Sequence, residues 1–118
     1  MITEVEAYKG PQDRASHAYG GRRTPRVEPL YADGGTVYVY LVYGLHWMLN
    51  FSTAAQGKPE AVLVRAILTD HAGERKPIVG PGRVCKYLKI DKKLDGADVT
   101  DSKLMWLEDK EINRLTAQ

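Results

Sequence analysis

The sequence predicts an α+β protein, and three observations support this. The chain has 118 residues, a length that suits one domain with a single hydrophobic core. Two runs rich in β-branched and aromatic residues, 36–42 and 47–53, flank Gly44 and predict a β-hairpin. Apolar residues at helical spacing in residues 83–90 predict a short helix. Strands therefore dominate the expected fold, and short helices are added to them.

The first part of the chain predicts one strand and a long connector. Residues 2–8 form the first expected strand, which Gly10 and Pro11 end because neither continues a ladder well. Residues 11–35 are rich in Arg, Gly and Pro, and one helical turn is expected near residues 13–18. A loop this long in a small domain is usually functional or disordered. The connector is therefore the first place to look for binding.

The second half predicts a buried strand and then helical segments. Residues 61–68 are so rich in Val, Leu and Ile that a buried strand is expected, although Arg65 interrupts the apolar run. The helix of residues 83–90 would follow two glycines and offer amide groups to an anion. A short strand at 105–107 and a helical fragment at 110–117 are also expected.

Composition restricts the classes of function. With 17 Lys and Arg against 15 Asp and Glu, the net charge of +2 does not by itself indicate a nucleic-acid partner. Residues 14–26, however, carry four arginines and His17 without any carboxylate, which suits phosphates. The single cysteine, Cys85, excludes a disulfide or a multi-cysteine metal site within one chain. No apolar stretch resembles a signal peptide or a membrane span, so a soluble intracellular protein is expected.

The tyrosines of the hairpin are candidates for binding a flat ligand. Tyr38 and Tyr40 would share one face of their strand, whereas Tyr43 stands beside the turn glycine, where a ring could be pushed between stacked bases. The alternative is that these rings are ordinary core and cross-strand pairs. Asn50 in the next strand, if buried, must be hydrogen-bonded, and its amide would then either read the edge of a ligand or be a satisfied core amide.

Two carboxylates on the first strand could take part in chemistry. Glu4 and Glu6 lie two residues apart, hence on one face, together with Tyr8. Arg65 is the expected partner, because a charge in an apolar strand is costly unless it is paired. A Glu and an Arg brought together could hold one water, with the Glu accepting its proton. The alternative is a purely structural ion pair.

Five segments taken together resemble the mammalian-type alkyladenine (3-methyladenine) DNA glycosylase family, which also occurs in bacteria. These segments are EVEAY at 4–8, ASH at 15–17, GGRRTPR at 20–26, YVYLVYG at 38–44 and GPGRVC at 80–85. The resemblance covers nearly the whole chain. It implies a single α+β domain with a curved, mainly antiparallel β-sheet, a protruding β-hairpin and a few short helices. Relatives have strands before Met1 and a closing segment after Gln118, so residues 1–118 are expected to be a glycosylase core truncated at both ends.

The resemblance implies a monofunctional DNA N-glycosylase of base-excision repair. Such an enzyme flips an alkylated or deaminated purine out of duplex DNA and hydrolyses its N-glycosyl bond, with no metal and no cofactor. The expected partner is double-stranded DNA that contains a damaged purine, with no membrane involved. The expected state is a monomer in the bacterial cytoplasm, associated with the nucleoid. The alternatives are a catalytically inactive, truncated module that binds DNA or lesions, and an unrelated domain that stacks single-stranded nucleic acid on its tyrosines.

Carried over by position, the resemblance also implies a role for each site residue. Glu6 corresponds to the general base and Arg65 to the arginine that helps to hold the water. Tyr8, His17 and Tyr40 correspond to the walls around the flipped base. The remaining positions correspond to Asn50 against the amino group of guanine, Tyr43 as the wedge in the duplex, and contacts to DNA from Arg22, Thr24, Pro25, Arg26, Gly82, Arg83 and Lys86.

This chain also departs from the family pattern. Val27 and Glu28 stand where relatives commonly place Asn and Arg, and the stretch between Leu68 and Gly80 is short.

Overall fold

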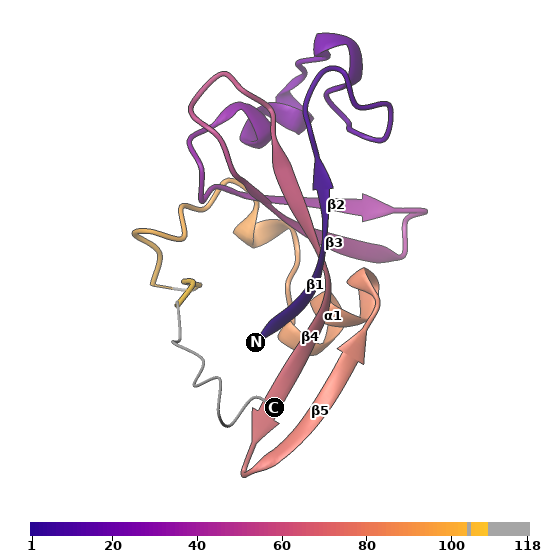
Figure 1. The fold of residues 1–118 in the computed structure, drawn as a ribbon, viewed down its shortest axis with the longest axis vertical. Helices are drawn as coiled ribbons and strands as arrows, with labels where there is room; N and C mark the ends of the chain where they lie inside the picture. The colour runs from indigo at the N-terminus through magenta and orange to yellow at the C-terminus, as the bar shows by residue number, and fades with distance from the viewer. Residues whose placement is uncertain (104, 109–118) are drawn as a thin grey trace, which may run out of the picture.

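A five-stranded antiparallel sheet forms the body of the protein (Figure 1). The computed structural model describes residues 1–103 and 105–108. The strands are β1 (Ile2–Tyr8), β2 (Val37–Val42), β3 (His46–Ser52), β4 (Ala61–His71) and β5 (Glu74–Val79). The described residues also include the α-helix α1 (Pro81–Leu88) and the 3-10 helices η1 (Tyr19–Gly21), η2 (Pro25–Tyr31) and η3 (Lys92–Leu94).

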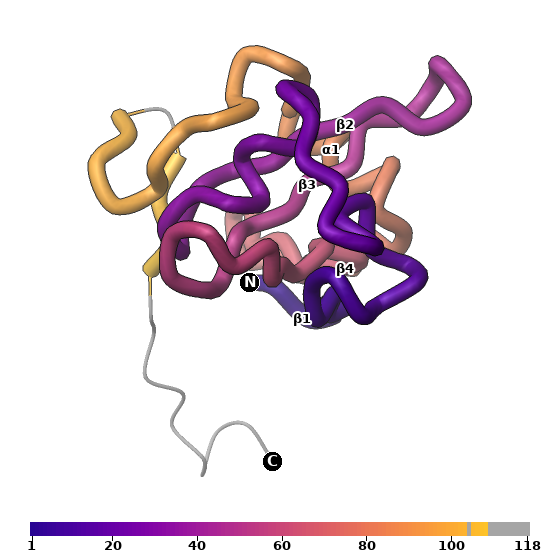
Figure 2. Tube along the Cα trace, turned by 90° about the horizontal axis from the view of Figure 1, so that it is seen from above, coloured from indigo at the N-terminus to yellow at the C-terminus, as the bar shows by residue number. Residues whose placement is uncertain are grey.

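The long strand β4 connects the two parts of the sheet. The strands lie in the order β1, β4, β3 and β2, and β5 pairs with the far half of β4. The sheet is strongly twisted, so β2 and β3 cross the direction of β1 and β4, and their hairpin projects beyond the rest of the molecule (Figures 1 and 2). The predicted α+β class, with a mainly antiparallel sheet in one domain, is therefore confirmed.

Most of the predicted elements are found where the sequence placed them. The first strand and both hairpin strands end within one residue of the expected bounds. The buried strand is longer than expected, because it continues beyond residue 68 to His71 and pairs there with β5, a strand that the sequence did not predict. The helix begins at Pro81, which suits the first position of a helix because its missing N–H would have no partner there.

Three expectations differ from the structure or fall outside it. Residues 13–18 form successive turns instead of a helical turn, and helical structure begins only at η1 and η2. Residues 105–107 do not form a strand, so that prediction was wrong. The helical fragment expected at 110–117 lies outside the described residues.

Two hydrophobic clusters pack on opposite faces of the sheet. One contains Val37 and Val39 of β2 together with Val84 of α1, and it forms the main core. The other contains Tyr38 of the same strand and residues of η2 such as Leu30. Because side chains alternate along a strand, β2 contributes valines to one cluster and tyrosines to the other. The second cluster supports the connector that was expected to bind a ligand.

Residues that follow η3 cover part of the outer edge of β2. The backbone N–H of Val37 donates to the carbonyl of Ala97 at 2.8 Å, and Gly96 N–H donates back to the Val37 carbonyl at 2.7 Å. The side chain of Asp95 then accepts a hydrogen bond from Val39 N–H at 2.8 Å. An unpaired strand edge can slip or aggregate, so these contacts hold the tyrosine strand in place.

Candidate active site

An aromatic cavity lies between the connector and the sheet. It is lined by Tyr8, Ala15, Ser16, His17, Leu30, Tyr38, Tyr40 and Asn50. The four residues predicted to contact a flipped base all belong to this lining. The enclosed volume is about 20 Å³, which suits about one water molecule and not a purine. Binding of a purine here would require the walls to move apart.

Short side chains of the connector bring His17 over the sheet. The carboxylate of Asp13 accepts hydrogen bonds from Lys9 N–H and Ala15 N–H, both at 3.0 Å. The hydroxyl of Ser16 accepts from Ala18 N–H at 3.1 Å, and Ala18 is fully buried. Side-chain acceptors of this kind stabilise turns at the expense of a helix. The connector is therefore an ordered wall of the cavity.

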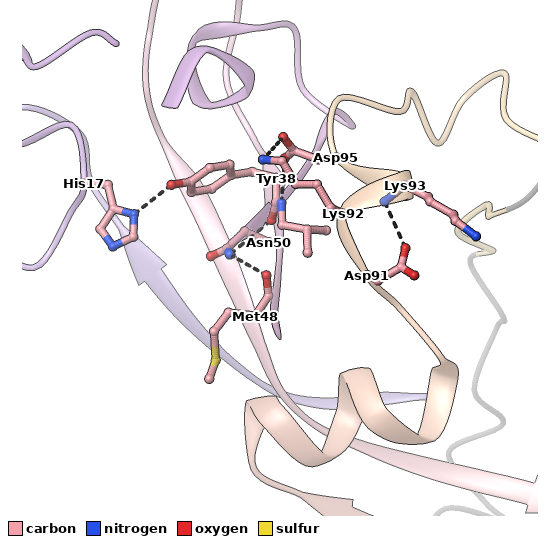
Figure 3. Close-up of polar contacts among 9 residues, drawn as sticks. His17, Tyr38, Met48, Asn50, Asp91, Lys92, Lys93 and Asp95 are labelled. Atoms are coloured by element: carbon pink, nitrogen blue, oxygen red, sulfur yellow. Dashed lines mark hydrogen bonds and ion pairs between the residues drawn. The ribbon is translucent and has the colours of Figure 1, made fainter. Parts of the chain in front are cut away.

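Three aromatic rings meet on the connector side of β2. The ring centroids of His17 and Tyr40 are 4.4 Å apart, with an interplanar angle of 61°. Tyr38 and Tyr40 are 5.3 Å apart between centroids. Nδ1 of His17 lies 2.8 Å from the hydroxyl oxygen of Tyr38 (Figure 3). The sequence placed Tyr38 on the same face as Tyr40 but indicated no contact with His17.

Asn50 is fixed in the floor of the cavity. It lies directly opposite Tyr38 in the ladder between β2 and β3, and it is 2 % exposed. Its side-chain Nδ2 donates to the backbone carbonyls of Tyr38 at 3.2 Å and Met48 at 3.4 Å (Figure 3). The amide is thus a satisfied core group that also faces the cavity. Anchored in this way, the side chain cannot easily swing out of the path of a ligand.

Glu6 and Arg65 form a direct ion pair. Nη1 of Arg65 lies 2.8 Å from Oε2 of Glu6, and Nε of Arg65 lies 3.3 Å from Oε1 of Glu4. An irregular register between β1 and β4 places Glu4 opposite Ala66 and Glu6 opposite Leu63, so that Arg65 can reach both carboxylates.

The pair differs from the expectation in two respects. The side chain of Arg65 is 41 % exposed and that of Glu6 is 43 % exposed, so neither charge is buried in the apolar core. The two groups also touch, so a water bound by both would sit beside the pair and not between its members. Water can reach the carboxylate from solvent.

Electrostatic effects link Glu6 to the aromatic cavity. Burial raises the pKa of Tyr8 to about 12, and the nearby Tyr40 hydroxyl and Glu6 carboxylate contribute to this rise. Burial also raises the pKa of Tyr40, and Glu6 again adds to the effect. Both phenols therefore keep their protons at neutral pH. The carboxylate is close enough to the cavity to act on both rings.

Tyr43 stands at the exposed tip of the hairpin. Its side chain is 92 % exposed, and Leu45 in the same turn is 75 % exposed. Tyr43 and Gly44 both have positive φ angles, of 52° and 67°, as in the type I′ turns that favour Asn-Gly. A tyrosine with positive φ is strained, so the turn holds a large ring in solvent at a conformational cost.

The cationic loop, residues 22–26, lies beside the cavity and is held in place by contacts within the connector. Arg22 and Arg26 are exposed and lie near His17, where burial and these two guanidinium groups lower the pKa of the imidazole. The Tyr31 hydroxyl donates to the Arg22 carbonyl at 2.6 Å. Arg23 pairs with Glu28 at 2.6 Å and lies 4.6 Å from the centre of the Tyr31 ring.

Val27 and Glu28, which depart from the family pattern, both have structural roles in this loop. Glu28 pairs with Arg23, and Val27 is buried in the cluster under the loop. Thr24 and Pro25 open η2, with Thr24 at the cap position and Pro25 in the first turn. The loop therefore has a fixed shape.

A separate groove lies between α1 and the start of β3, next to the turn of the hairpin. It has a volume of about 430 Å³, and its lining includes His46, Trp47, Gly82 and Lys86. A Cβ atom at Gly82 would lie 3.2 Å from the His46 ring, so a glycine here permits the close approach of α1 to β3. Arg83 is exposed on the same helix. The predicted DNA contacts of α1 thus lie beside the hairpin and outside the aromatic cavity.

Other kinds of site find little support in the part of the chain that the structure describes. Residues 1–103 and 105–108 contain no group of three or more His, Cys, Asp or Glu that could hold a metal ion. Burial raises the pKa of the Cys85 thiol to about 11, and this side chain is 1 % exposed. No described helix has both the length and the apolar character required to cross a membrane.

Comparison with known proteins gives one consistent result. The model of the methylpurine-DNA glycosylase (MPG) family matches residues 1–117. A protein of Desulfitobacterium hafniense strain Y51 is 40 % identical over 129 residues, which cover 93 % of this chain and 64 % of the relative. A protein of Psychrobacter cryohalolentis is 41 % identical over 124 residues, covering 92 % and 58 %, and one of Clostridium tetani is 41 % identical over 131 residues, covering 93 % and 64 %.

The names of these relatives agree, and their lengths exceed that of this chain. Each of the three is named "Putative 3-methyladenine DNA glycosylase". This chain spans 58 to 64 % of their length.

Proposed function

Because this chain belongs to the methylpurine-DNA glycosylase family, we propose that it is the core of a DNA repair enzyme that flips a damaged purine out of the duplex and hydrolyses its N-glycosyl bond. Residues 1–118 would form one such core. The observation that carries the proposal is the position of Glu6, which pairs with Arg65 at 2.8 Å and lies two residues before Tyr8 of the aromatic cavity, on the same face of β1. A water activated at Glu6 would then meet a base stacked on the rings of this cavity.

The hydrolytic step is assigned to Glu6. The oxygen of a water attacks C1′ of the sugar, its proton passes to Glu6, and the N-glycosyl bond breaks with its electrons going to the departing purine. Because Oε2 of Glu6 is bound by Arg65, we assign the other oxygen, Oε1, to the water. The carboxylate also stabilises the positive charge that develops on the sugar. General-base catalysis of this kind contributes about 10² to 10⁴-fold to a rate.

Binding of the base is assigned to the cavity. The energy needed to unstack a base is a few kcal/mol, least for a lesion that pairs poorly, and stacking on aromatic rings returns about 1 to 3 kcal/mol per base. Tyr8 would form one wall, with His17 and Tyr40 as the others, and the exposed His17 is the wall that moves when a purine enters. Asn50, anchored to two backbone carbonyls, would exclude the exocyclic amino group of guanine.

The surface around the cavity is assigned to duplex DNA. Tyr43 would fill the gap left by the flipped nucleotide, as apolar wedges do elsewhere. Phosphate contacts would come from two places. The cationic loop would contribute Arg22, Thr24, Pro25 and Arg26, and α1 would contribute Gly82, Arg83 and Lys86. One protein molecule is enough for this arrangement, so a monomer is proposed.

Release of a base from a labelled duplex tests the proposal. Duplexes that contain hypoxanthine or ethenoadenine should lose the base, and Glu6→Gln should lower the rate by about 10² to 10⁴-fold while lesion binding is retained. Glu4→Gln is the matched control, because it removes the same charge from the same strand and the same arginine. An equal loss of rate in both variants would contradict the role of Glu6.

A second outcome would favour a different function. The chain spans less than two thirds of the length of its relatives, which leaves open a module that binds lesions without turnover. Salt-dependent binding of the duplex with no base released by the wild-type protein would support that alternative.

A further inference from the structure

Tyr38 links two residues of the cavity but has no part in the mechanism above. Its side chain is 1 % exposed, and its hydroxyl oxygen lies 2.8 Å from Nδ1 of His17. Its backbone carbonyl accepts the hydrogen bond from Asn50 at 3.2 Å. In Figure 3 the Tyr38 side chain points toward His17 and Asn50 lies beside the Tyr38 backbone, with the second ring nitrogen of His17 turned away from Tyr38.

The burial of Tyr38 decides which partner donates. Burial raises the pKa of Tyr38 to about 12, so the hydroxyl keeps its proton. Among the described residues, His17 Nδ1 is the one hydrogen-bond partner of this hydroxyl. If Nδ1 carried the imidazole proton, the buried phenol hydrogen would have no acceptor among the described residues, which is unfavourable. The arrangement that satisfies both groups has Tyr38 O–H donating to Nδ1, with the proton of His17 on Nε2.

We propose that Tyr38 is a positioning residue that holds His17 as the neutral Nε2–H tautomer, so that the cavity offers the base a hydrogen-bond donor without a positive charge. The proposal rests on the proposed function, since it concerns the base-binding wall. An alkylated purine can carry a positive charge, and an imidazolium ring beside it would repel it. A neutral imidazole, by contrast, leaves an aromatic face for the cation.

The other groups around His17 act in the same direction. Arg22 and Arg26 of the loop face it with positive charge, and together with burial they lower its pKa below the usual 6.5. Tyr40, whose pKa is raised, faces His17 from β2, and Tyr8 lines the same cavity from β1. Both phenols are uncharged at neutral pH. No carboxylate is among the lining residues of the cavity, so nothing in that lining favours the protonated ring.

Nitrogen NMR of the DNA-free protein tests the tautomer directly. The ¹⁵N shifts of His17 should show a proton on Nε2 in the wild-type protein. In Tyr38→Phe, which removes the donor to Nδ1, the tautomer preference should weaken and the pKa of His17 should rise. Tyr31→Phe is the matched control, because it removes a buried hydroxyl of the same cluster that donates to the Arg22 carbonyl and not to His17. A proton on Nδ1 in the wild type, or equal shifts in both variants, would overturn the proposal.

The consequence for the base is tested by comparing two lesions. Release of the cationic base 3-methyladenine, which lacks the amino group of guanine, and of the neutral base hypoxanthine is measured for wild type and Tyr38→Phe. The pH range lies between the pKa of His17 in the wild type and its pKa in the variant. Relative to wild type, the variant should lose the cationic base selectively, by about tenfold for each pH unit below its own pKa. Equal loss of both bases would mean a merely structural role. If the wild-type protein releases neither base, the proposed function fails, and the NMR measurement alone decides the tautomer.

Discussion

The turn at the tip of the hairpin allows stability and function to be separated. Tyr43 has a φ of 52° and a side chain that is 92 % exposed. Replacing it with asparagine would create Asn-Gly, the pair that type I′ turns prefer. We expect Tyr43→Asn to fold more stably than the wild type and to bind lesions less well, because under the proposed function the strained ring contacts DNA and adds little to the fold.

Both effects can be estimated from the structure. The left-handed conformation costs a residue with a bulky side chain about 1 to 2 kcal/mol, most of which asparagine avoids. Loss of the ring removes almost no buried surface, so the free energy of unfolding should rise by about 1 kcal/mol. For a chain of this size, Tm should then rise by roughly 4 °C. Without a ring to stack in the duplex, binding should weaken by about 1 to 3 kcal/mol, which is about thirtyfold in the middle of that range.

Two assays on the same samples decide the matter. Thermal unfolding gives the change in Tm, and titration of a fluorescent duplex that contains a lesion gives the change in affinity. Leu45→Asn is the control for stability, because Leu45 lies in the same turn and is 75 % exposed but is not among the residues with positive φ. A lower Tm for Tyr43→Asn would show that the ring stabilises the free protein, and unchanged affinity would refute its role as a wedge.

Two further predictions concern the loop and the core. Glu28→Gln should free Arg23 from its pair, tighten binding to duplex DNA and steepen the dependence of affinity on salt by about one phosphate contact. Glu74→Gln, an equal change of charge on the exposed β5, should not steepen it, and identical slopes for both variants would exclude an effect of the pair. The Cys85 thiol, which is buried and has its pKa raised to about 11, should resist a thiol reagent at pH 8 until the protein is unfolded. Rapid modification of the folded protein would show that the core around α1 opens.

The sequence predicted the strands that have strong alternation or a high apolar content. It did not predict β5, which forms because it pairs with β4. β5 is mostly exposed, is rich in charge and contains Pro77, so no pattern marks it. It forms because the far half of β4 supplies a partner, with Pro77 opposite Leu68 on an edge that tolerates proline. The helical turn expected at 13–18 failed because Asp13 and Ser16 accept backbone N–H groups in turns.

The positions of several candidate site residues were predicted for sound physical reasons. Pairing of Glu6 with Arg65 followed from the cost of an unpaired charge in an apolar strand, although Arg65 proved to be half-exposed. Tyr40 and Asn50 followed from alternation and from the need to satisfy a polar group in a strand. The contact between His17 and Tyr38 could not be predicted in this way, because it joins a connector without periodicity to a strand 21 residues away.

The alternation of β2 connects the fold to the proposed chemistry. Val37 and Val39 of β2 belong to the main core, whereas Tyr38 and Tyr40 line the cavity. The same strand ends at the turn that contains Tyr43. A slip of one residue would exchange these sets, placing tyrosines in the core and valines in the cavity. The hydrogen bond from Val39 N–H to Asp95 lies on the edge of β2 that does not pair with β3. It still matters to the site, because it helps to fix the register of β2. Asp95 is itself held by Lys92 at 2.8 Å, so a contact outside the aromatic cavity helps to set which side chains line it.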